Sequence, residues 1–251
     1  MNKTVLKTVL GRNKWFAGLP SELTDAILRL GRVRRLNEAL IYSASDCADG
    51  MIALISGQIR LTSFSMSGQP SFLVLTSPGS WIGTTSALDG RPHGYDAFAI
   101  GETVLFQLSQ ERFNLLVGES VGHYAAFVRL LCDHFRITTQ YLIIHRNHRP
   151  LYLLAHELLR LADRHGKRTK NGVVIEMRLS QEDLAVMIGV GRQTINRLLK
   201  SLEQDGIVTT SYTALTIQNV EALERLRRPL ARSKSRGLGG LDGINACLRL
   251  R

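Results

Sequence analysis

The spacing of hydrophobic positions changes along the chain, and each change predicts a different kind of structure. Between residues 39 and 108, short apolar runs such as 51–55, 58–61, 72–75 and 103–108 are separated by Gly, Asp, Pro and Ser. Turn signals at intervals of about 8–12 residues are typical of an antiparallel barrel or sandwich. From residue 109 to 146 the spacing becomes helical, and much of that segment is predicted to be one long helix.

The long helix carries a narrow seam of mostly apolar residues, repeating at alternating intervals of three and four. Its members are Val121, Tyr124, Val128, Leu131, Phe135, Thr138, Leu142 and His145. Such spacing suits a partner helix, whereas packing against the chain's own β domain is the alternative. The segment 147–150 is interpreted as a hinge, because proline disfavours helix in the residue before it.

The segment after the hinge predicts a small domain of helices and strands. An amphipathic helix, a basic loop, a short strand, a hairpin and a closing helix are expected over 151–163, 165–172, 173–177, 207–217 and 221–226. At the ends of the chain, residues 1–14 are predicted to be a basic, poorly ordered arm, followed by a short helical segment. Residues 227–251 are rich in Arg, Ser and Gly and are expected to be disordered.

Two short helices with a turn between them are predicted over 179–207. Ser180 can cap the first helix, and Asp183, three residues later, suits a capping box. Gly189 ends the apolar stripe of this first helix. The second helix is expected over roughly 191–204, with Gly206 stopping it and its apolar side formed by Ile195, Leu198 and Leu202.

The opposite side of the second helix is basic and rich in amides. It carries Arg192, Gln193, Thr194, Asn196, Arg197 and Lys200. A short helix that is apolar behind and carries Arg, Gln and Asn in front suits reading base edges in a DNA major groove. A merely solvated charged face is the alternative.

The segment from Leu179 to Leu199 resembles the DNA-binding signature of the CRP/FNR superfamily of bacterial transcription regulators. It matches the pattern L-S/T-x-x-D/E-L-A-x-x-x-G-x-S/T-R-x-T-V/I-x-R-x-L, except that Gly191 replaces the hydroxyl residue that usually caps the reading helix. The resemblance implies an α+β fold with an antiparallel β-roll (a cyclic-nucleotide-binding-like jelly roll), a long dimerisation helix and a C-terminal winged helix-turn-helix. The implied divisions are 1–35, 36–118, 119–148, 149–226 and the tail 227–251.

The resemblance also implies partners and roles. A homodimer would bind double-stranded DNA, with RNA polymerase as a further partner. By position, Arg192 and Arg197 match base- and phosphate-contacting arginines, and Gln193 matches a base contact that is often Glu. Since Glu accepts from cytosine while Gln pairs with adenine, base preference should differ there. Thr194 is expected to meet a phosphate or a thymine methyl, while Lys200 and the loop 167–170 are candidates for phosphate contacts.

The β-roll glycines resemble those of a cyclic-nucleotide site, but the phosphate motif of such a site, G-E-L-x-L-L-x-x-x-P-R-S/T-A, is altered. Thr84 stands at the Glu position, His93 at the Arg position and Gly94 at the hydroxyl position, and turn geometry argues against substitution by Arg91. Losing an Arg–phosphate pair typically costs several kcal/mol. The pocket candidates are Gly83, Thr84, Thr85, Arg91, His93, Gly94, Tyr95, Thr138 and Thr139, the last two falling where the family places a purine-contacting Thr/Ser pair.

We therefore expect no tight binding of cyclic AMP and no cofactor. The pocket is expected to serve an unknown small-molecule effector or to have lost its ligand, with a genuine cyclic-nucleotide sensor as the alternative. Three scattered cysteines (Cys47, Cys132, Cys247) are too few for an iron–sulfur cluster. Haem bound through a histidine such as His93 is disfavoured. The histidine pairs also lack Cys or carboxylate companions at metal spacing.

Charge and composition narrow the remaining functions. The formal net charge is +11, yet residues 36–125 carry three basic and eight acidic side chains, so the excess lies in the ends and the C-terminal half. This distribution suits polyanion binding by one part of the chain. No nucleophile–base or paired-carboxylate motif predicts an enzyme. No apolar run suggests a membrane span or signal peptide, so we expect a cytoplasmic protein without membrane contact.

Overall fold

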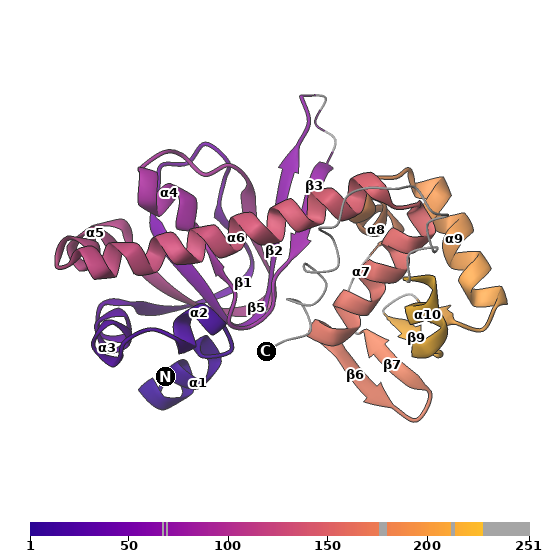
Figure 1. Cartoon of the computed structure of the whole chain (residues 1–251), viewed down its shortest axis with the longest axis horizontal. Helices are drawn as coiled ribbons and strands as arrows, with labels where there is room; N and C mark the ends of the chain where they lie inside the picture. Colours follow the sequence, from indigo (N-terminus) through magenta and orange to yellow (C-terminus); the bar gives the residue numbers. More distant parts are fainter. Residues whose placement is uncertain (67, 69, 176–179, 212–213, 228–251) are drawn as a thin grey trace, which may run out of the picture.

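The computed structural model describes residues 1–227 apart from 67, 69, 176–179 and 212–213. Two domains are joined by a long helix, α6 (Val121–Asn147), which crosses the molecule from one domain to the other (Figure 1). The N-terminal domain is an antiparallel sheet with helices packed around it, and the C-terminal domain combines helices with a small sheet. This architecture confirms the predicted α+β class, with a β-roll, a long helix and a C-terminal helix-turn-helix.

The N-terminal sheet has the strand order β1–β5–β2–β3, and β4 pairs with β2. The strands are β1 (Arg32–Tyr42), β2 (Gly50–Phe64), β3 (Pro70–Leu75), β4 (Trp81–Ile82) and β5 (Asp96–Ser109). Alternate residues of β2 enter two cores: Met51 and Ala53 face one, while Ile52 and Leu54 face the other. Because both faces of the strand are buried, its sequence there is a continuous apolar run.

The prediction that residues 51–55 and 58–61 form separate strands is wrong. They are two halves of β2, whose pairing with β5 shifts between Leu54 and Ser56 and again between Ser56 and Gln58. Gly57 has a φ of +84°, and a Cβ there would lie 2.4 Å from the carbonyl oxygen of Glu102. The glycine therefore permits a bulge within one long strand rather than a turn between two.

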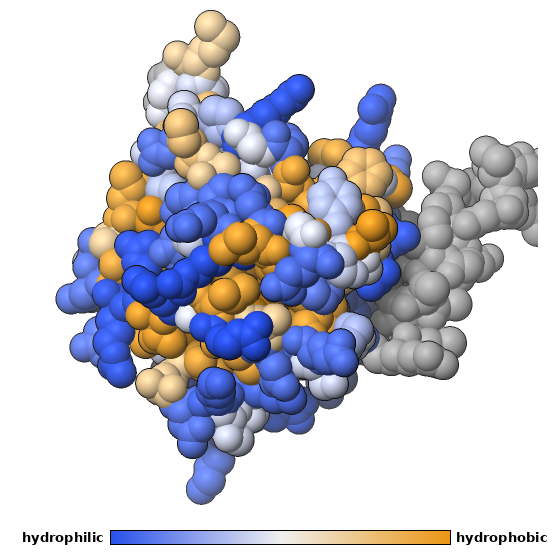
Figure 2. Space-filling view, turned by 90° about the vertical axis from the view of Figure 1, so that its left-hand side faces the viewer, coloured by the Kyte–Doolittle hydropathy of each residue, from blue (hydrophilic) through white to orange (hydrophobic). Residues whose placement is uncertain are grey.

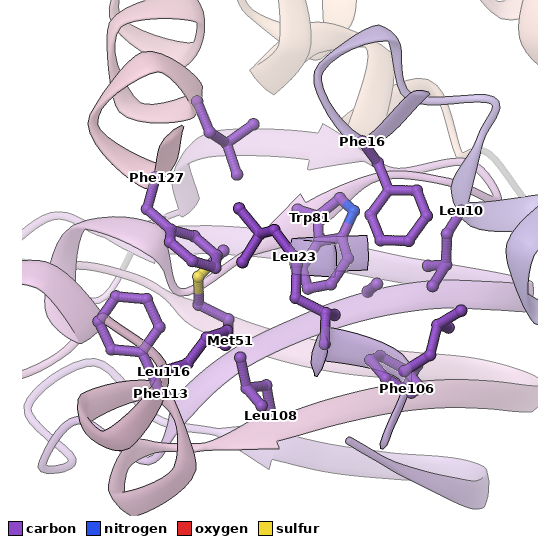
Figure 3. Packing of buried hydrophobic residues seen from close by; sticks show 14 of the residues in the cluster. Leu10, Phe16, Leu23, Met51, Trp81, Phe106, Leu108, Phe113, Leu116 and Phe127 are labelled. Carbon is purple, nitrogen blue, oxygen red and sulfur yellow. The ribbon is translucent and has the colours of Figure 1, made fainter. Parts of the chain in front are cut away.

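The expectation of a poorly ordered N-terminal arm is also wrong. Residues Lys3–Leu10 form α1. Asn2 caps the start of this helix, because its side chain accepts a hydrogen bond from the backbone N–H of Thr4. Helices α2 (Lys14–Ala17) and α3 (Ser21–Leu30) follow. Leu6 and Leu10 are buried because they lie on one face of α1 and reach the main core. Figure 3 shows Leu10 in this core with Phe16, Leu23, Met51, Trp81, Phe106, Leu108, Phe113, Leu116 and Phe127.

Two short helices complete the N-terminal domain, and α6 then leads to the second domain. They are α4 (Thr84–Asp89) and α5 (Gln110–Gly118). The segment predicted as mostly one helix is therefore two, because the chain turns after Gly118 and α6 is capped anew by Ser120. The C-terminal domain opens with α7 (Pro150–His165), whose proline occupies the first turn, where it removes no intrahelical hydrogen bond.

The C-terminal domain has the expected order of elements. Its strands and helices are β6 (Gly166–Thr169), β7 (Gly172–Ile175), α8 (Gln181–Ile188), α9 (Arg192–Gln204), β8 (Val208–Thr210), β9 (Leu215–Ile217) and α10 (Val220–Leu226). The strands form one sheet in the order β6–β7–β9–β8. The predicted loop over 165–172 is instead largely strand, since Lys167 and Arg168 of β6 pair with β7. The tail after residue 227 lies outside the described residues.

Candidate nucleic-acid interface and sensor pocket

Local capping sets the start and the end of α8. The Ser180 hydroxyl accepts from the backbone N–H of Asp183 at 3.0 Å, and the Asp183 carboxylate accepts from the backbone N–H of Ser180 at 2.9 Å. Gly189 ends the helix with a φ of +70°, a conformation that glycine adopts without steric cost. The predicted capping box is confirmed, and it positions the turn that leads into α9.

The apolar side of α9 packs into the C-terminal domain core. Ile195, Leu199 and Leu202 are buried, whereas Leu198, which we expected to be buried, is only half-buried at the edge of that core. Leu199, which lies about 100° around the helix from Leu198, takes the buried place instead. Gly191 occupies the N-cap without a side-chain hydrogen bond, as its lack of a hydroxyl requires.

The polar side of α9 faces outward. Arg192, Gln193, Arg197 and Lys200 are exposed, while Thr194 and Asn196 are half-buried. In Figure 1, α9 lies at the end of the molecule farthest from the β-roll. Exposed guanidinium and amide groups on one short helix match the donors and acceptors that base edges and phosphates present.

One residue beside this surface was missed by sequence reasoning. The Asn196 side-chain amide donates to Gln181 Oε1 at 3.1 Å, which joins the middle of α9 to the first turn of α8. Gln181 occupies a position at which the family pattern accepts any residue, so the motif gave no signal for it. The basic residues Lys167 and Arg168 lie on β6, at the opposite edge of the sheet from β8, the strand that contacts α9.

The seam of α6 is exposed over much of its length. The exposed fractions are 86% for Val121, 46% for Tyr124, 70% for Phe135 and 62% for Leu142. Val128, Leu131 and His145 are half-buried, and Thr138 is exposed. Figure 2 looks onto the end of the molecule where α6 begins, and apolar residues gather near the middle of that face among polar ones. Large apolar side chains exposed in a row along one helix indicate a binding face.

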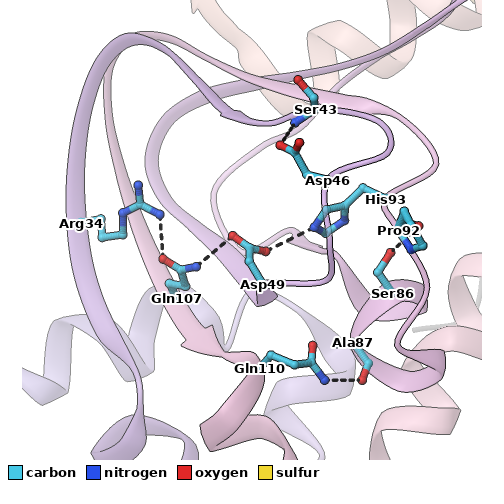
Figure 4. A network of polar contacts seen from close by, with 10 residues as sticks. All are labelled: Arg34, Ser43, Asp46, Asp49, Ser86, Ala87, Pro92, His93, Gln107 and Gln110. Carbon is cyan, nitrogen blue, oxygen red and sulfur yellow. Dashed lines mark hydrogen bonds and ion pairs between the residues drawn. The ribbon is translucent and has the colours of Figure 1, made fainter.

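The sensor pocket is built around His93 rather than around an arginine. The imidazole stacks on Tyr42, with ring centroids 3.7 Å apart and planes 11° from parallel. Its Nε2 lies 3.3 Å from Asp49 Oδ1. Asp49 in turn accepts from Gln107 Nε2 at 3.2 Å, and Gln107 Oε1 accepts from Arg34 at 2.7 Å. Figure 4 shows this chain of contacts reaching from β1 to the segment before β5.

The other pocket candidates fall into two groups. Gly83, Thr84 and His93 are buried and Tyr95 is half-buried, and burial raises the pKa of Tyr95. The Thr84 hydroxyl is buried without a hydrogen-bond partner among the described residues. In contrast, Thr85, Arg91 and Gly94 are exposed. The backbone N–H of Arg91 donates to Asp89 at 3.0 Å, which tightens an outer turn.

The two threonines of α6 use their hydroxyls within the helix. Thr138 donates to the carbonyl of His134 at 3.0 Å, and Thr139 donates to the carbonyl of Phe135 at 2.9 Å. Side-chain hydroxyls bonded to the preceding turn are common in helices. In this arrangement each hydroxyl could meet a ligand only as a hydrogen-bond acceptor, because its proton is used within the helix.

The C-terminal domain touches the β-roll through α8. Arg60 of β2 lies 3.4 Å from Asp183, the capping-box residue, and the Tyr141 hydroxyl of α6 donates to the carbonyl of Met187. Leu75 of β3 is buried in the same cluster as Leu184 of α8. The first helix of the helix-turn-helix is therefore held by both the sheet and the long helix.

Four histidines with lowered pKa values lie near the end of α6, in the hinge and along α7. Burial lowers the pKa values of His145, His148, His156 and His165. The buried Glu157 opposes this shift at His145 and His156, while Arg227, Arg160 and His145 add to it at His156. Arg160 and Arg164 lower the pKa of His165 further. Glu157 is itself paired, accepting from Arg160 Nε at 2.9 Å.

The described residues also bear on metal binding and membrane insertion. Nowhere in that part of the chain do three or more His, Cys, Asp or Glu side chains gather as metal ligands could. None of the helices found there combines the length and apolar character needed to cross a membrane.

Two family models match the chain, one for each domain. A model for the cyclic nucleotide-binding domain matches residues 33–120, and a model for the Crp-like helix-turn-helix domain matches residues 154–226. The first covers the sheet and α5, and the second covers α8, α9 and strands β8 and β9. The matched segments therefore include α9 and the pocket residues 83–95, whereas α6 lies between them.

Individual relatives match over most of their length. The CRP-like cAMP-activated global transcriptional regulator of Mycobacterium tuberculosis is 22% identical over 221 residues, which is 88% of this chain and 99% of that protein. The cyclic AMP receptor protein of Thermus thermophilus is 26% identical over 219 residues, 86% and 97% of the two chains. The structure of FixK2 from Bradyrhizobium japonicum shares the fold, with a TM-score of 0.68, 17% identity and coverage of 80% and 99%. With both domains matched in the same order, the chain belongs to the CRP/FNR superfamily of transcription regulators.

Proposed function

We propose that this regulator is a homodimer that recognises a specific DNA sequence with α9 and carries a degenerate cyclic-nucleotide-binding-like sensor domain. The observation that carries the proposal is the division of α9 into a buried apolar side and an exposed side bearing Arg192, Gln193 and Arg197. Two such helices would enter successive major grooves about one helical turn apart on a near-palindromic site. The protein would act by binding, with RNA polymerase as a further partner, rather than by catalysis.

The side chains of α9 divide by chemistry into readers and phosphate contacts. Arg192 and Arg197 can each form two hydrogen bonds to a guanine, and Gln193 can pair with an adenine. Thr194 suits a phosphate or a thymine methyl, and Lys200 a phosphate. Lys167 and Lys170 belong to the β6–β7 hairpin, at the edge of the sheet opposite β8. They would reach phosphates only if the DNA extends past β8 and β9 to that edge.

Selection of binding sites from random duplexes, followed by gel retardation, tests DNA recognition. We expect a near-palindromic site, and Arg197→Ala should weaken its binding by about 1–3 kcal/mol. Affinity should fall steeply as salt rises, because phosphate contacts release counterions. Unchanged retardation by the variant would remove Arg197 from the interface, and a flat salt titration would exclude DNA as the partner.

The sensor domain is proposed to bind no cyclic nucleotide tightly. A cyclic phosphate needs a cation to neutralise it, whereas the place of the family arginine holds His93, enclosed by Tyr42 and Asp49. The Asp49 carboxylate would repel a phosphate brought next to the imidazole. An effector, if one binds this end of the roll, would be a molecule other than a cyclic phosphate.

A cyclic-nucleotide-responsive regulator is the second candidate, and the match of residues 33–120 to the cyclic nucleotide-binding domain favours it. Calorimetric titration with cyclic AMP and cyclic GMP separates the two candidates. Micromolar binding that is lost in a variant of the pocket would support the second. Absence of heat at millimolar nucleotide, with retained DNA binding, is the result expected from the first.

A further inference from the structure

A cluster of titratable side chains lies where α6 is followed by α7, and the proposed function does not use it. Tyr141 and His145 belong to α6, and His156, Glu157 and Arg160 belong to α7. The two helices lie close enough here for their charges to interact, since Glu157 influences both side chains of α6. His145 in turn influences His156. In Figure 1, α7 leaves the end of α6 at a sharp angle, so this α6–α7 cluster spans the connection between the two domains.

Direct contacts tie the α6–α7 cluster to the helix-turn-helix. The rings of Tyr141 and His145 pack together with centroids 3.8 Å apart, and the Tyr141 hydroxyl donates to the carbonyl of Met187 in α8. On α7, the Glu157 side chain is buried and its carboxylate accepts from Arg160 Nε at 2.9 Å. His145 therefore lies beside the side chain that joins α6 to α8, and it faces an ion pair that is already complete.

The charges of this cluster balance only while its two histidines are neutral. Burial lowers the pKa of His145 and His156, so both imidazoles are neutral at pH 7 in this arrangement. The charged groups that face them are Glu157 and Arg160, which neutralise each other, and Arg227 at the end of α10. The Nδ1 atom of His156 is buried without a hydrogen-bond partner among the described residues. Because a protonated imidazole donates from both nitrogens, protonation would leave a buried donor without an acceptor.

We propose that His145 and His156 form an acid-sensitive hinge, in which protonation of the two imidazoles separates α7 from α6 and weakens DNA binding. Two added positive charges would repel each other and Arg160 in a partly buried site, where such repulsion is stronger than in water. Since α7 leads into α8 and α9, its movement would change the spacing of the two reading helices in the dimer. This inference rests on the proposed function, because its consequence is a change in DNA affinity.

The sign of the effect follows from the lowered pKa values. The packed arrangement binds fewer protons than the separated one, so DNA affinity should be complete above the ordinary histidine pKa of about 6.5 and should fall below it. The loss is limited to about tenfold per histidine for each pH unit. Fluorescence anisotropy with the selected duplex, from about pH 7.5 to pH 5.5, measures this profile on the full chain.

The double variant His145→Gln with His156→Gln tests the assignment, because glutamine stays neutral at every pH of the titration. It should bind like the wild type at about pH 7.5 and lose much less affinity at about pH 5.5. His134→Gln is the matched control. His134 is also half-buried on α6, and burial also lowers its pKa, but the charge acting on it is that of Asp133 on its own helix. This control should keep the wild-type profile.

Hydrogen exchange of the DNA-free chain tests the hinge separately from DNA binding. After correction for the intrinsic effect of pH, α7 and α8 should exchange faster at about pH 5.5 in the wild type than in the double variant, while β2 and β5 should exchange equally in both. Equal exchange of α7 and α8, or a double variant whose affinity falls as steeply as that of the wild type, overturns the inference. Faster exchange in a wild-type chain that binds no duplex at any pH would instead overturn the proposed function and leave the hinge in place.

Discussion

Phe135 offers the most direct test of the proposed dimer. It is 70% exposed at the centre of the α6 seam, and a phenylalanine presents about 200 Å² of surface. Roughly 140 Å² is therefore available for burial, which at about 25 cal/mol per Å² corresponds to roughly 3.5 kcal/mol for each protomer. Twofold symmetry doubles this value to an upper limit of about 7 kcal/mol.

Phe135→Ala should weaken the dimer by about half of that limit, because alanine still covers part of the seam and burial at a helix pair is incomplete. A loss of about 3 kcal/mol corresponds to a rise of roughly a hundredfold in the dimer dissociation constant. Sedimentation equilibrium over a dilution series measures that constant. Binding to a palindromic duplex should weaken in parallel, since two linked reading helices bind more tightly than one.

Arg136→Ala is the matched control for this experiment. The Arg136 side chain is also 70% exposed, but it pairs with Asp133 on the solvent side of the helix at 3.0 Å. Removing an exposed pair of this kind changes stability little, and the dimer constant should stay within a few-fold of the wild-type value. If Phe135→Ala and the wild-type chain have equal dimer constants, the seam is not the interface and the reasoning from its exposure fails.

Three further predictions follow from the fold. Acidification should destabilise the chain, because burial lowers the pKa of His145, His148, His156 and His165 in the folded state. The unfolded chain therefore binds more protons below its ordinary histidine pKa of about 6.5. The melting temperature should therefore be steady above that pH and fall below it, and a flat profile down to about pH 5 would refute this assignment. Arg60→Ala should speed hydrogen exchange in α8 at a cost of about 1 kcal/mol or less, as the ion pair to Asp183 is partly exposed; equal exchange would show that the apolar contacts alone hold α8. Gly83→Ala should cost more stability in urea unfolding than Gly90→Ala, because both have positive φ but only at Gly83 would a Cβ meet backbone, 2.6 Å from the Gly50 oxygen; equal losses would indicate that the backbone relaxes there.

Local signals in the sequence were sufficient for the two helices of the helix-turn-helix and for the class of fold. The capping box at Ser180 and the glycine at 189 act within a few residues of the helix ends that they set, so α8 and α9 could be located without tertiary information. The outward side of α9 followed from helical periodicity, and the motif supplied its chemistry. The exposed seam of α6 was predictable for the same reason.

Tertiary contacts decided the features that depend on residues far apart in the chain. His93 and Asp49 are 44 positions apart and Arg60 and Asp183 are 123 apart, so no spacing rule connects them. The basic N-terminal segment forms α1 because Leu6 and Leu10 pack into the core beside the sheet. Composition alone does not predict this contact. Likewise, sequence places Asn196 on the reading side of α9, but only the packing of α8 against α9 brings Gln181 within hydrogen-bond distance of it. Helix ends and amphipathic faces are set by neighbouring residues, whereas polar networks and domain contacts depend on how the chain brings distant segments together.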